Sequence, residues 1–279
     1  MLELLTDHTL RTVALGAAVL GLLSGALGTF AVLRRQSLLG DALAHATLPG
    51  VVLAFLVTQE RATPVLMVGA GLAAAAAALL ITAVVRHTRI KQDAALAVVL
   101  SVFFGLGTVL LTVVASDGGA GQAGLDRFVL GQAATLVAAD VRTMALLAAI
   151  ALALVVACFK ELTVVSFDPT FARALGYRVG RVEGLLTVLL VVAIVVGIQT
   201  VGVVLVSALL ITPAAAARHW TDRLGAMVVL AAVFGAVSGV AGALVSARAV
   251  DLPTGPVIVL VATTIFVVSL PVRRLRRRA

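Results

Sequence analysis

The chain has 279 residues, of which 62% are hydrophobic and only 12% charged, and its mean hydropathy is +1.18. Soluble domains are roughly half apolar and a quarter charged, so this composition excludes a cytosolic globular enzyme, a disordered chain and a secreted disulfide scaffold. The formal net charge is +8, but the basic residues lie in short loops between apolar runs, where they determine topology rather than bind nucleic acid. We therefore expect an all-α, polytopic integral membrane protein that binds no nucleic acid.

Eight apolar runs follow one another along the chain, each long enough for the roughly 20 residues that cross a bilayer. They cover about 12–33, 36–58, 63–85, 94–116, 143–159, 184–217, 224–247 and 252–272. The run at 184–217 would measure about 51 Å as one helix, too long for a hydrocarbon core of about 30 Å. Gly197–Gly202 at its midpoint predicts a break, so we expect eight to nine transmembrane helices in a single transmembrane domain over residues 1–279.

Basic residues are distributed unequally between alternate loops. One side collects 16 of them, including Arg34, Arg35 and the loop Lys160–Arg181, and the other side holds five. Cytoplasmic loops carry the excess of lysine and arginine, which predicts a cytoplasmic C-terminus and, with nine crossings, an N-terminus outside. If 184–217 formed one kinked span or a re-entrant hairpin, the number of crossings and the side of the N-terminus would change.

Most of the apolar spans lack ionisable side chains, and the segment Leu38–Gly50 is the exception. Asp41 and His45 are four residues apart, so on a helix they share a face. Pro49 lacks an amide hydrogen, which leaves the carbonyl of His45 without its helical partner and predicts a kink. Carboxylate oxygen and imidazole nitrogen suit Mn²⁺, Fe²⁺ or Zn²⁺. The alternative is that Asp41 caps a helix near the membrane surface and His45 is a satisfied interior histidine.

The cytoplasmic loop at about 160–183 contains the signals of a short helix. Asp168 is a favourable N-cap, Pro169 fits the first turn, and Gly176 fits the C-terminal stop. Phe171 and Leu175 would then lie on one face, at positions i and i+4. Two interpretations remain open, a loop helix that lies on the membrane surface and a docking element for a soluble partner.

Small residues recur at intervals of four in two of the spans. Gly21 and Gly25 form one such pair, and Gly235 and Gly239 form another. This spacing allows helices to approach closely. We interpret both pairs first as packing within one chain rather than as a dimer contact.

Four segments, in the same order, resemble the permeases of manganese, zinc and iron ABC importers. They are Arg34–Gly50, Ser166–Gly176, Val203–Arg218 and Asp251–Pro256. The resemblance covers nearly the whole chain. It implies the fold of type II importers, the class that carries cobalamin and ferric siderophores, and a multi-pass location in a bacterial or archaeal cell membrane.

The resemblance also implies residue roles and partners. Asp41 and His45 match the family's proposed intramembrane metal ligands, and Pro49 and Pro213 lie at expected helix kinks. The coupling helix that rests on the ATPase matches Asp168, Pro169, Phe171, Ala172, Leu175 and Gly176. The partners would be two cytosolic ATPase subunits, an extracytoplasmic metal-binding protein and a second permease, in a homodimer or a heterodimer. The metal ion is cargo, and no permanently bound cofactor is expected.

A secondary transporter is the main rival interpretation, in which Asp41 and His45 relay protons instead of binding a metal. The sequence contains no P-loop, so this chain is not expected to be an enzyme, and any ATP hydrolysis would occur in a separate subunit. A membrane scaffold or an intramembrane enzyme is disfavoured, because no nucleophile and base pair stands out within the spans.

Overall fold

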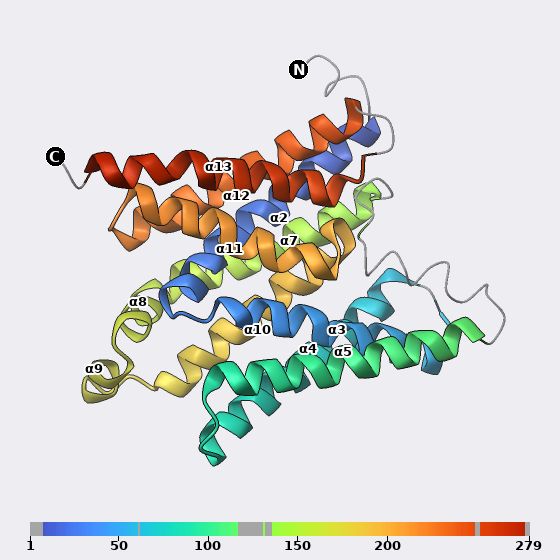
Figure 1. Ribbon diagram of the computed structural model, residues 1–279, viewed down its shortest axis with the longest axis horizontal. Coiled ribbons are helices and arrows are strands. Elements are labelled where there is room, and N and C mark those ends of the chain that lie inside the picture. The colour runs from blue at the N-terminus through green and yellow to red at the C-terminus, as the bar shows by residue number, and fades with distance from the viewer. Residues whose placement is uncertain (1–7, 61, 117–130, 132–135, 249–251, 277–279) are drawn as a thin grey trace.

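The computed structural model describes residues 8–60, 62–116, 131, 136–248 and 252–276. Within these ranges every regular element is an α-helix, and no strand occurs (Figure 1). In chain order the helices are α2 (His8–Leu33), α3 (Ser37–Thr58), α4 (Thr63–His87), α5 (Gln92–Ser116), α7 (Ala138–Ala157), α8 (Phe159–Phe167), α9 (Pro169–Ala174), α10 (Val179–Val201), α11 (Val203–Trp220), α12 (Leu224–Arg248) and α13 (Thr254–Arg276).

The predicted spans are confirmed to within five residues, and the starts of α7 and α10 show the largest differences. Helix α10 begins at Val179, five residues before 184, and α7 begins at Ala138, five residues before the predicted start at 143. The first turn of α7 contains Asp140, whose carboxylate accepts a hydrogen bond from the backbone amide of Val137. The predicted apolar run left charged residues out, but an acidic residue is favourable in the first turn of a helix that begins before the hydrocarbon core.

The long run at 184–217 is divided into two helices, as predicted. The break is at Gly202, whose φ of 87° is accessible mainly to glycine. Close packing beside the turn also needs glycine, because a Cβ on Gly197 would collide with Val206 of α11. Eight helices are long and apolar enough to cross a membrane, and the 18-residue helix α11 is a ninth long helix in the described part of the chain.

Neighbouring helices run in opposite directions, and pairs of contacts establish this for α10 and α11. Along α2, Arg34 contacts Glu183 at one end of α10, while Leu20 lies near Gly197 toward the other end, so α2 and α10 are antiparallel. Near Gly197, Leu20 of α2 lies beside Val206 of α11, and farther along both helices Gly28 meets Leu210, so α11 runs parallel to α2. Consequently α10 and α11 each traverse the bundle, which is the arrangement that nine crossings require.

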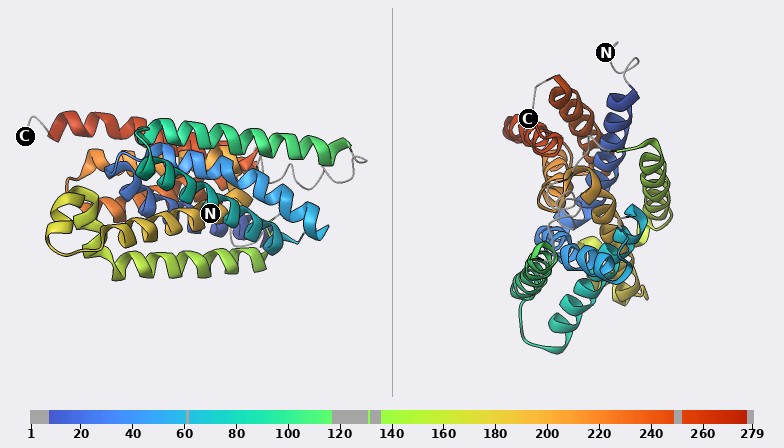
Figure 2. Two further views of the ribbon diagram at one scale, coloured as in Figure 1. Left: turned by 90° about the horizontal axis from the view of Figure 1, so that it is seen from below. Right: turned by 90° about the vertical axis from the view of Figure 1, so that its right-hand side faces the viewer.

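The basic segments gather at one end of the bundle. Helices α8 and α9 lie at this end together with the C-terminal end of α13 (Figures 1 and 2). Arg34 at the end of α2 pairs there with Glu183 of α10, and Arg86 at the end of α4 reaches Gly180. The sequence positions that predict one membrane side therefore share one end of the structure.

Helices α2 and α12 pack backbone against backbone through the two predicted glycine pairs. A Cβ on Gly21 would collide with the carbonyl of Gly235, and one on Gly235 would collide with the carbonyl of Gly21. Gly25 and Gly239 are equally close to the carbonyls of Ala231 and Ala17. The interpretation of both spacings as packing within one chain is thus confirmed.

Burial is uneven across the bundle. In α2, 78% of the most apolar window is buried, and in α3 67%, whereas the value for α5 is 17%. Leucine and valine side chains of α5 and α7 are exposed on the outside of the protomer, where lipid or another subunit would cover them. Helices α2 and α3 therefore form the interior of the bundle, and α3 carries Asp41 and His45.

Replacement of Gly21 by alanine tests the packing of α2 against α12. Because the added methyl group has no room beside the Gly235 carbonyl, we expect the backbones to separate and the free energy of unfolding to fall by about 1–3 kcal/mol. Gly105→Ala is the matched control, since a Cβ there meets no atom within 4 Å. Thermal unfolding of both variants in detergent is the measurement, and equal midpoints would contradict the contact.

Candidate functional site

Helix α3 brings the two candidate ligands onto one face. Arg35, with a φ of 56°, reverses the chain after α2, and Gln36 is the N-cap residue. Because α3 begins at Ser37, Asp41 lies about 6 Å along the helix axis and His45 about 12 Å. The alternative that Asp41 caps this helix is wrong, because it is the fifth helical residue and bonds instead to another helix.

Asp41, His45 and Ser207 form a polar cluster between α3 and α11. The Asp41 Oδ1 lies 3.6 Å from His45 Nε2, and it accepts a hydrogen bond of 3.1 Å from the Ser207 hydroxyl. With metal–ligand distances of about 2.1 Å, two ligands of one ion lie roughly 3.0–3.4 Å apart in octahedral or tetrahedral coordination. The two α3 side chains are therefore close to the spacing at which they could share one cation.

The imidazole of His45 is held by packing rather than by hydrogen bonds. Its ring makes an edge contact with Phe104 of α5, with centroids 5.0 Å apart. Its Nδ1 is buried and has no hydrogen-bond partner among the described residues, so His45 is not the satisfied interior histidine of the alternative interpretation. The Nε2 atom, directed toward Asp41, is the nitrogen available to a ligand.

Ser207 reaches Asp41 because α11 packs tightly against α2 and α3. The carbonyl of Leu210 occupies the space that a Cβ on Gly28 would need, and its side chain lies beside Gly40. Ser207 is one turn before Leu210 on the same face of α11. Sequence reasoning placed Ser207 in a family-like segment but assigned it no role, because nothing in the spacing shows which α11 residue faces α3.

The described residues of one chain contain no group of three or more histidine, cysteine, aspartate or glutamate side chains that could hold a metal ion. Asp41 and His45 thus provide two ligands, whereas these cations take four to six. The side chain of Asp41 is 36% exposed on the surface of the protomer, and the adjacent Phe104 is also exposed. The cluster is therefore open on the side where further ligands would have to come from water or another subunit.

Both prolines of interest lie inside continuous helices. Pro49 is within α3 and Pro213 is within α11, and both are buried. Immediately after Pro49, a Cβ on Gly50 would collide with the carbonyl of Gly69, so α3 and α4 are in close contact there. The proline reduces the amide pairing of α3 near the His45 carbonyl without ending the helix.

The predicted short helix is confirmed as α9, with its capping residues. Asp168 Oδ1 accepts hydrogen bonds of 2.9 Å from the amides of Thr170 and Phe171, and Pro169 occupies the first turn. Gly176 has a φ of 86°. The backbone amides of Gly176 and Tyr177 donate hydrogen bonds to the carbonyls of Arg173 and Ala172, respectively, which completes a Schellman motif.

One face of α9 is buried and the other is exposed. Ala172 packs with Val165 and Val179, which fixes α9 to α8 and to the start of α10. Phe171 and Leu175 are each 55% exposed, and Phe167 at the end of α8 is 62% exposed. Three large exposed apolar side chains thus occur within nine residues at the tip of the basic end, and we call this segment the α9 tip (Phe167, Phe171 and Leu175).

Comparison with known proteins identifies the family. The model of the ABC 3 transport family matches residues 6–273. The zinc transport system membrane protein TroC of Treponema pallidum is 49% identical over 270 residues, which cover 97% of this chain and 91% of that protein. The manganese transport system membrane protein MntC of Bacillus subtilis is 48% identical over 255 residues, which cover 91% of this chain but only 59% of that longer protein.

A solved structure has the same fold. PsaBC from Streptococcus pneumoniae, in complex with Fab, superposes with a TM-score of 0.86 at 33% identity, covering 99% of this chain and 98% of the matched chain. The family match extends over nearly all of the sequence and includes both the polar cluster and the α9 tip. The chain belongs to the ABC 3 transport family.

Proposed function

We propose that this chain is the transmembrane permease subunit of an ATP-driven importer of divalent metal ions. It acts as one transmembrane domain and passes the ion by alternating access through the cluster of Asp41, His45 and Ser207. The observation that carries this proposal is the pair of metal-ligand side chains at 3.6 Å, open on the protomer surface. An ionisable group exposed within a bilayer is costly, and normally faces an aqueous pathway or a partner.

A second permease would complete the site. One chain supplies one carboxylate and one imidazole, so two copies facing each other supply two of each, enough to replace part of the hydration shell of an ion. Oxygen and nitrogen ligands suit Mn²⁺, Zn²⁺ and Fe²⁺. The names of the relatives include manganese and zinc transport, so we expect one of these two ions as the cargo.

The α9 tip would contact a cytosolic ATPase subunit. Exposed apolar clusters rimmed by polar residues mark protein interaction sites, and no P-loop occurs in the sequence. This assignment puts the basic end and the C-terminus in the cytoplasm of a bacterial or archaeal cell, in agreement with the excess of arginine and lysine at that end. An extracytoplasmic metal-binding protein would deliver the ion at the opposite end.

Transport by variants of Asp41 and His45 tests the metal site. In proteoliposomes that contain the permease, its ATPase and its binding protein, we expect Asp41→Asn and His45→Gln to abolish ATP-dependent uptake of Mn²⁺ or Zn²⁺, since each removes a ligand. Asp93→Asn and His87→Gln are matched controls on exposed residues, and should transport like the wild type.

The same assay separates the proposal from the rival secondary transporter. Uptake that follows an imposed proton gradient and does not require ATP would support the rival and refute the ATP-driven importer. ATP-dependent uptake that persists in both variants would retain the importer and exclude Asp41 and His45 as its metal ligands.

Ser207→Ala tests whether the hydrogen bond to Asp41 orients the carboxylate. Groups that support a metal ligand typically change metal affinity 10- to 100-fold when removed. We therefore expect the metal concentration at half-maximal uptake to rise about tenfold, with little change in the maximal rate. Ser207→Thr retains a hydroxyl and should restore much of the affinity, whereas equal uptake curves for wild type and Ser207→Ala would exclude this role.

Substitution at the α9 tip tests ATPase docking. Phe171→Ser and Leu175→Ser remove exposed apolar side chains, so we expect loss of ATPase copurification without loss of the folded permease. Leu252→Ser is the control, because Leu252 is 48% exposed at the other end of the bundle. Copurification of the ATPase at wild-type levels with both tip variants would rule out the contact.

A further inference from the structure

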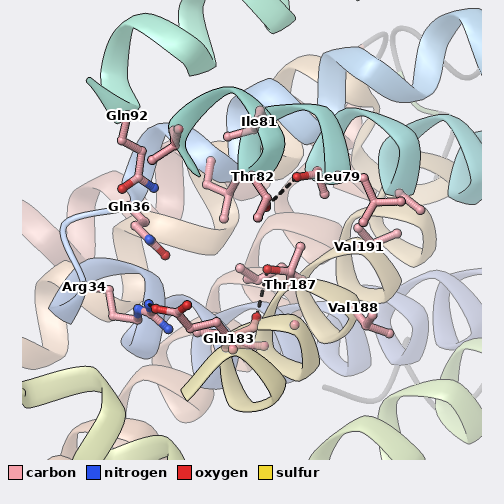
Figure 3. A pocket seen from close by; sticks show the side chains of 18 of the residues that line it. Arg34, Gln36, Leu79, Ile81, Thr82, Gln92, Glu183, Thr187, Val188 and Val191 are labelled. Atoms are coloured by element: carbon pink, nitrogen blue, oxygen red, sulfur yellow. Dashed lines mark hydrogen bonds and ion pairs between the residues drawn. The ribbon is translucent and has the colours of Figure 1, made fainter. Parts of the chain in front are cut away.

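A cleft that the metal pathway does not use opens between α4 and α10 at the basic end of the bundle. Its volume is about 590 Å³, and the connection between α2 and α3 and the start of α5 complete its walls (Figure 3). On α3 it is lined by Leu39. Leu39 and Asp41 are about 200° apart around the helix, so the cleft and the polar cluster lie on opposite sides of α3.

The cleft is polar at one end and apolar at the other. In Figure 3, Arg34, Gln36, Gln92 and Glu183 lie toward one end, and Leu79, Val188 and Val191 lie toward the other. Between the two ends, the hydroxyls of Thr82 and Thr187 donate to carbonyls of their own helices, at 2.8 and 2.9 Å. The polar end coincides with the last turn of α4 and the first turns of α10, where lipid headgroups meet a transmembrane bundle.

The ionisable side chains that line the cleft carry a net charge of +1. Arg34 pairs with Glu183 at 2.5 Å, and its side chain is only 9% exposed. Arg86 is the second lining arginine; it is exposed and has no ion pair among the described residues. Its guanidinium lies beside Gly180, 3.5 Å from the position of a Cβ there. One positive charge at the mouth is thus left to bind an anion.

We propose that this cleft binds one phospholipid of net charge −1 from the leaflet at the basic end of the bundle. Arg86 holds the phosphate, with the amides of Gln36 and Gln92 beside it, and an acyl chain lies along Leu79, Val188 and Val191. The charge of a single phosphodiester matches the net charge of the cleft, and the apolar end matches a hydrocarbon chain. This site is independent of the metal assignment above.

Gly184 allows the cleft to be filled without disturbing the fold. It lines the cleft, and a Cβ on it would meet no atom within 4 Å, so Gly184→Leu places a side chain in the space assigned to the acyl chain. Gly105→Leu is the matched control, because Gly105 on α5 is equally unobstructed and lies outside the cleft. Arg86→Gln removes the anion contact, and Arg89→Gln removes a nearby charge that does not line the cleft.

Native mass spectrometry of the full chain, alone and assembled with its ATPase, measures the binding of phosphatidylglycerol and phosphatidylcholine. We expect one saturable phosphatidylglycerol per chain in the wild type and in both controls. A basic residue contributes about fivefold to the binding of an anionic lipid, so Arg86→Gln should weaken binding by about that factor. Gly184→Leu should abolish it. Phosphatidylcholine, whose choline offsets the phosphate charge, should bind the wild type more weakly than phosphatidylglycerol and lose less affinity than phosphatidylglycerol in Arg86→Gln.

Three outcomes would overturn the proposal. Equal phosphatidylglycerol binding by Gly184→Leu and the wild type would show that the lipid lies elsewhere. Equal effects of Arg86→Gln and Arg89→Gln would show a general response to charge instead of a contact at the mouth. Loss of lipid binding on assembly, together with failure of Gly184→Leu to assemble, would identify the cleft as a protein contact.

Discussion

The packing of Leu210 between two glycines is the contact on which the polar cluster depends. Its carbonyl occupies the space beside Gly28 of α2, and its side chain lies against Gly40 of α3. Since α11 is held at this distance by steric contact, Ser207 one turn away is within hydrogen-bond range of Asp41. A side chain larger than hydrogen at position 28 would move α11 outward, and a bond of 3.1 Å does not tolerate such a shift.

The Arg34–Glu183 ion pair links the start of α10, which follows the α9 tip, to the segment that precedes α3 and its polar cluster. Glu183 lies in the second turn of α10, shortly after α9, and Arg34 lies just before the start of α3. Asp41 is therefore only seven residues along the chain from Arg34, which is anchored to the helix that directly follows the α9 tip. In the proposed transporter, the ATPase would move the α9 tip, and this movement would act close to the metal site. The movement would therefore not have to be transmitted across the whole thickness of the bilayer.

Much of the fold could be predicted from sequence because the membrane constrains it strongly. Backbone polar groups in hydrocarbon must pair within a helix, so apolar runs predict the spans directly. The turn at Gly202 was predictable because 34 uncharged residues exceed the thickness of the bilayer, although its position was known only to within six residues. The starts of α7 and α10 were missed because the charged residues of their first turns, Asp140 and Arg181, lie outside the apolar pattern. The capping of α9 was predictable because Asp168, Pro169 and Gly176 act locally.

The sequence by itself determined the all-helical architecture, the segregation of basic residues to one end, the α9 helix and the i, i+4 pairing of Asp41 with His45. These follow from hydropathy, charge and local backbone geometry, which operate over a few residues. Only the tertiary structure decided that Ser207 bonds to Asp41, that Phe104 packs on His45, and that an amphipathic cleft opens between α4 and α10. Such contacts join residues up to 166 positions apart, and depend on which faces of the helices meet, a property that hydropathy does not encode because nearly every face of these helices is apolar.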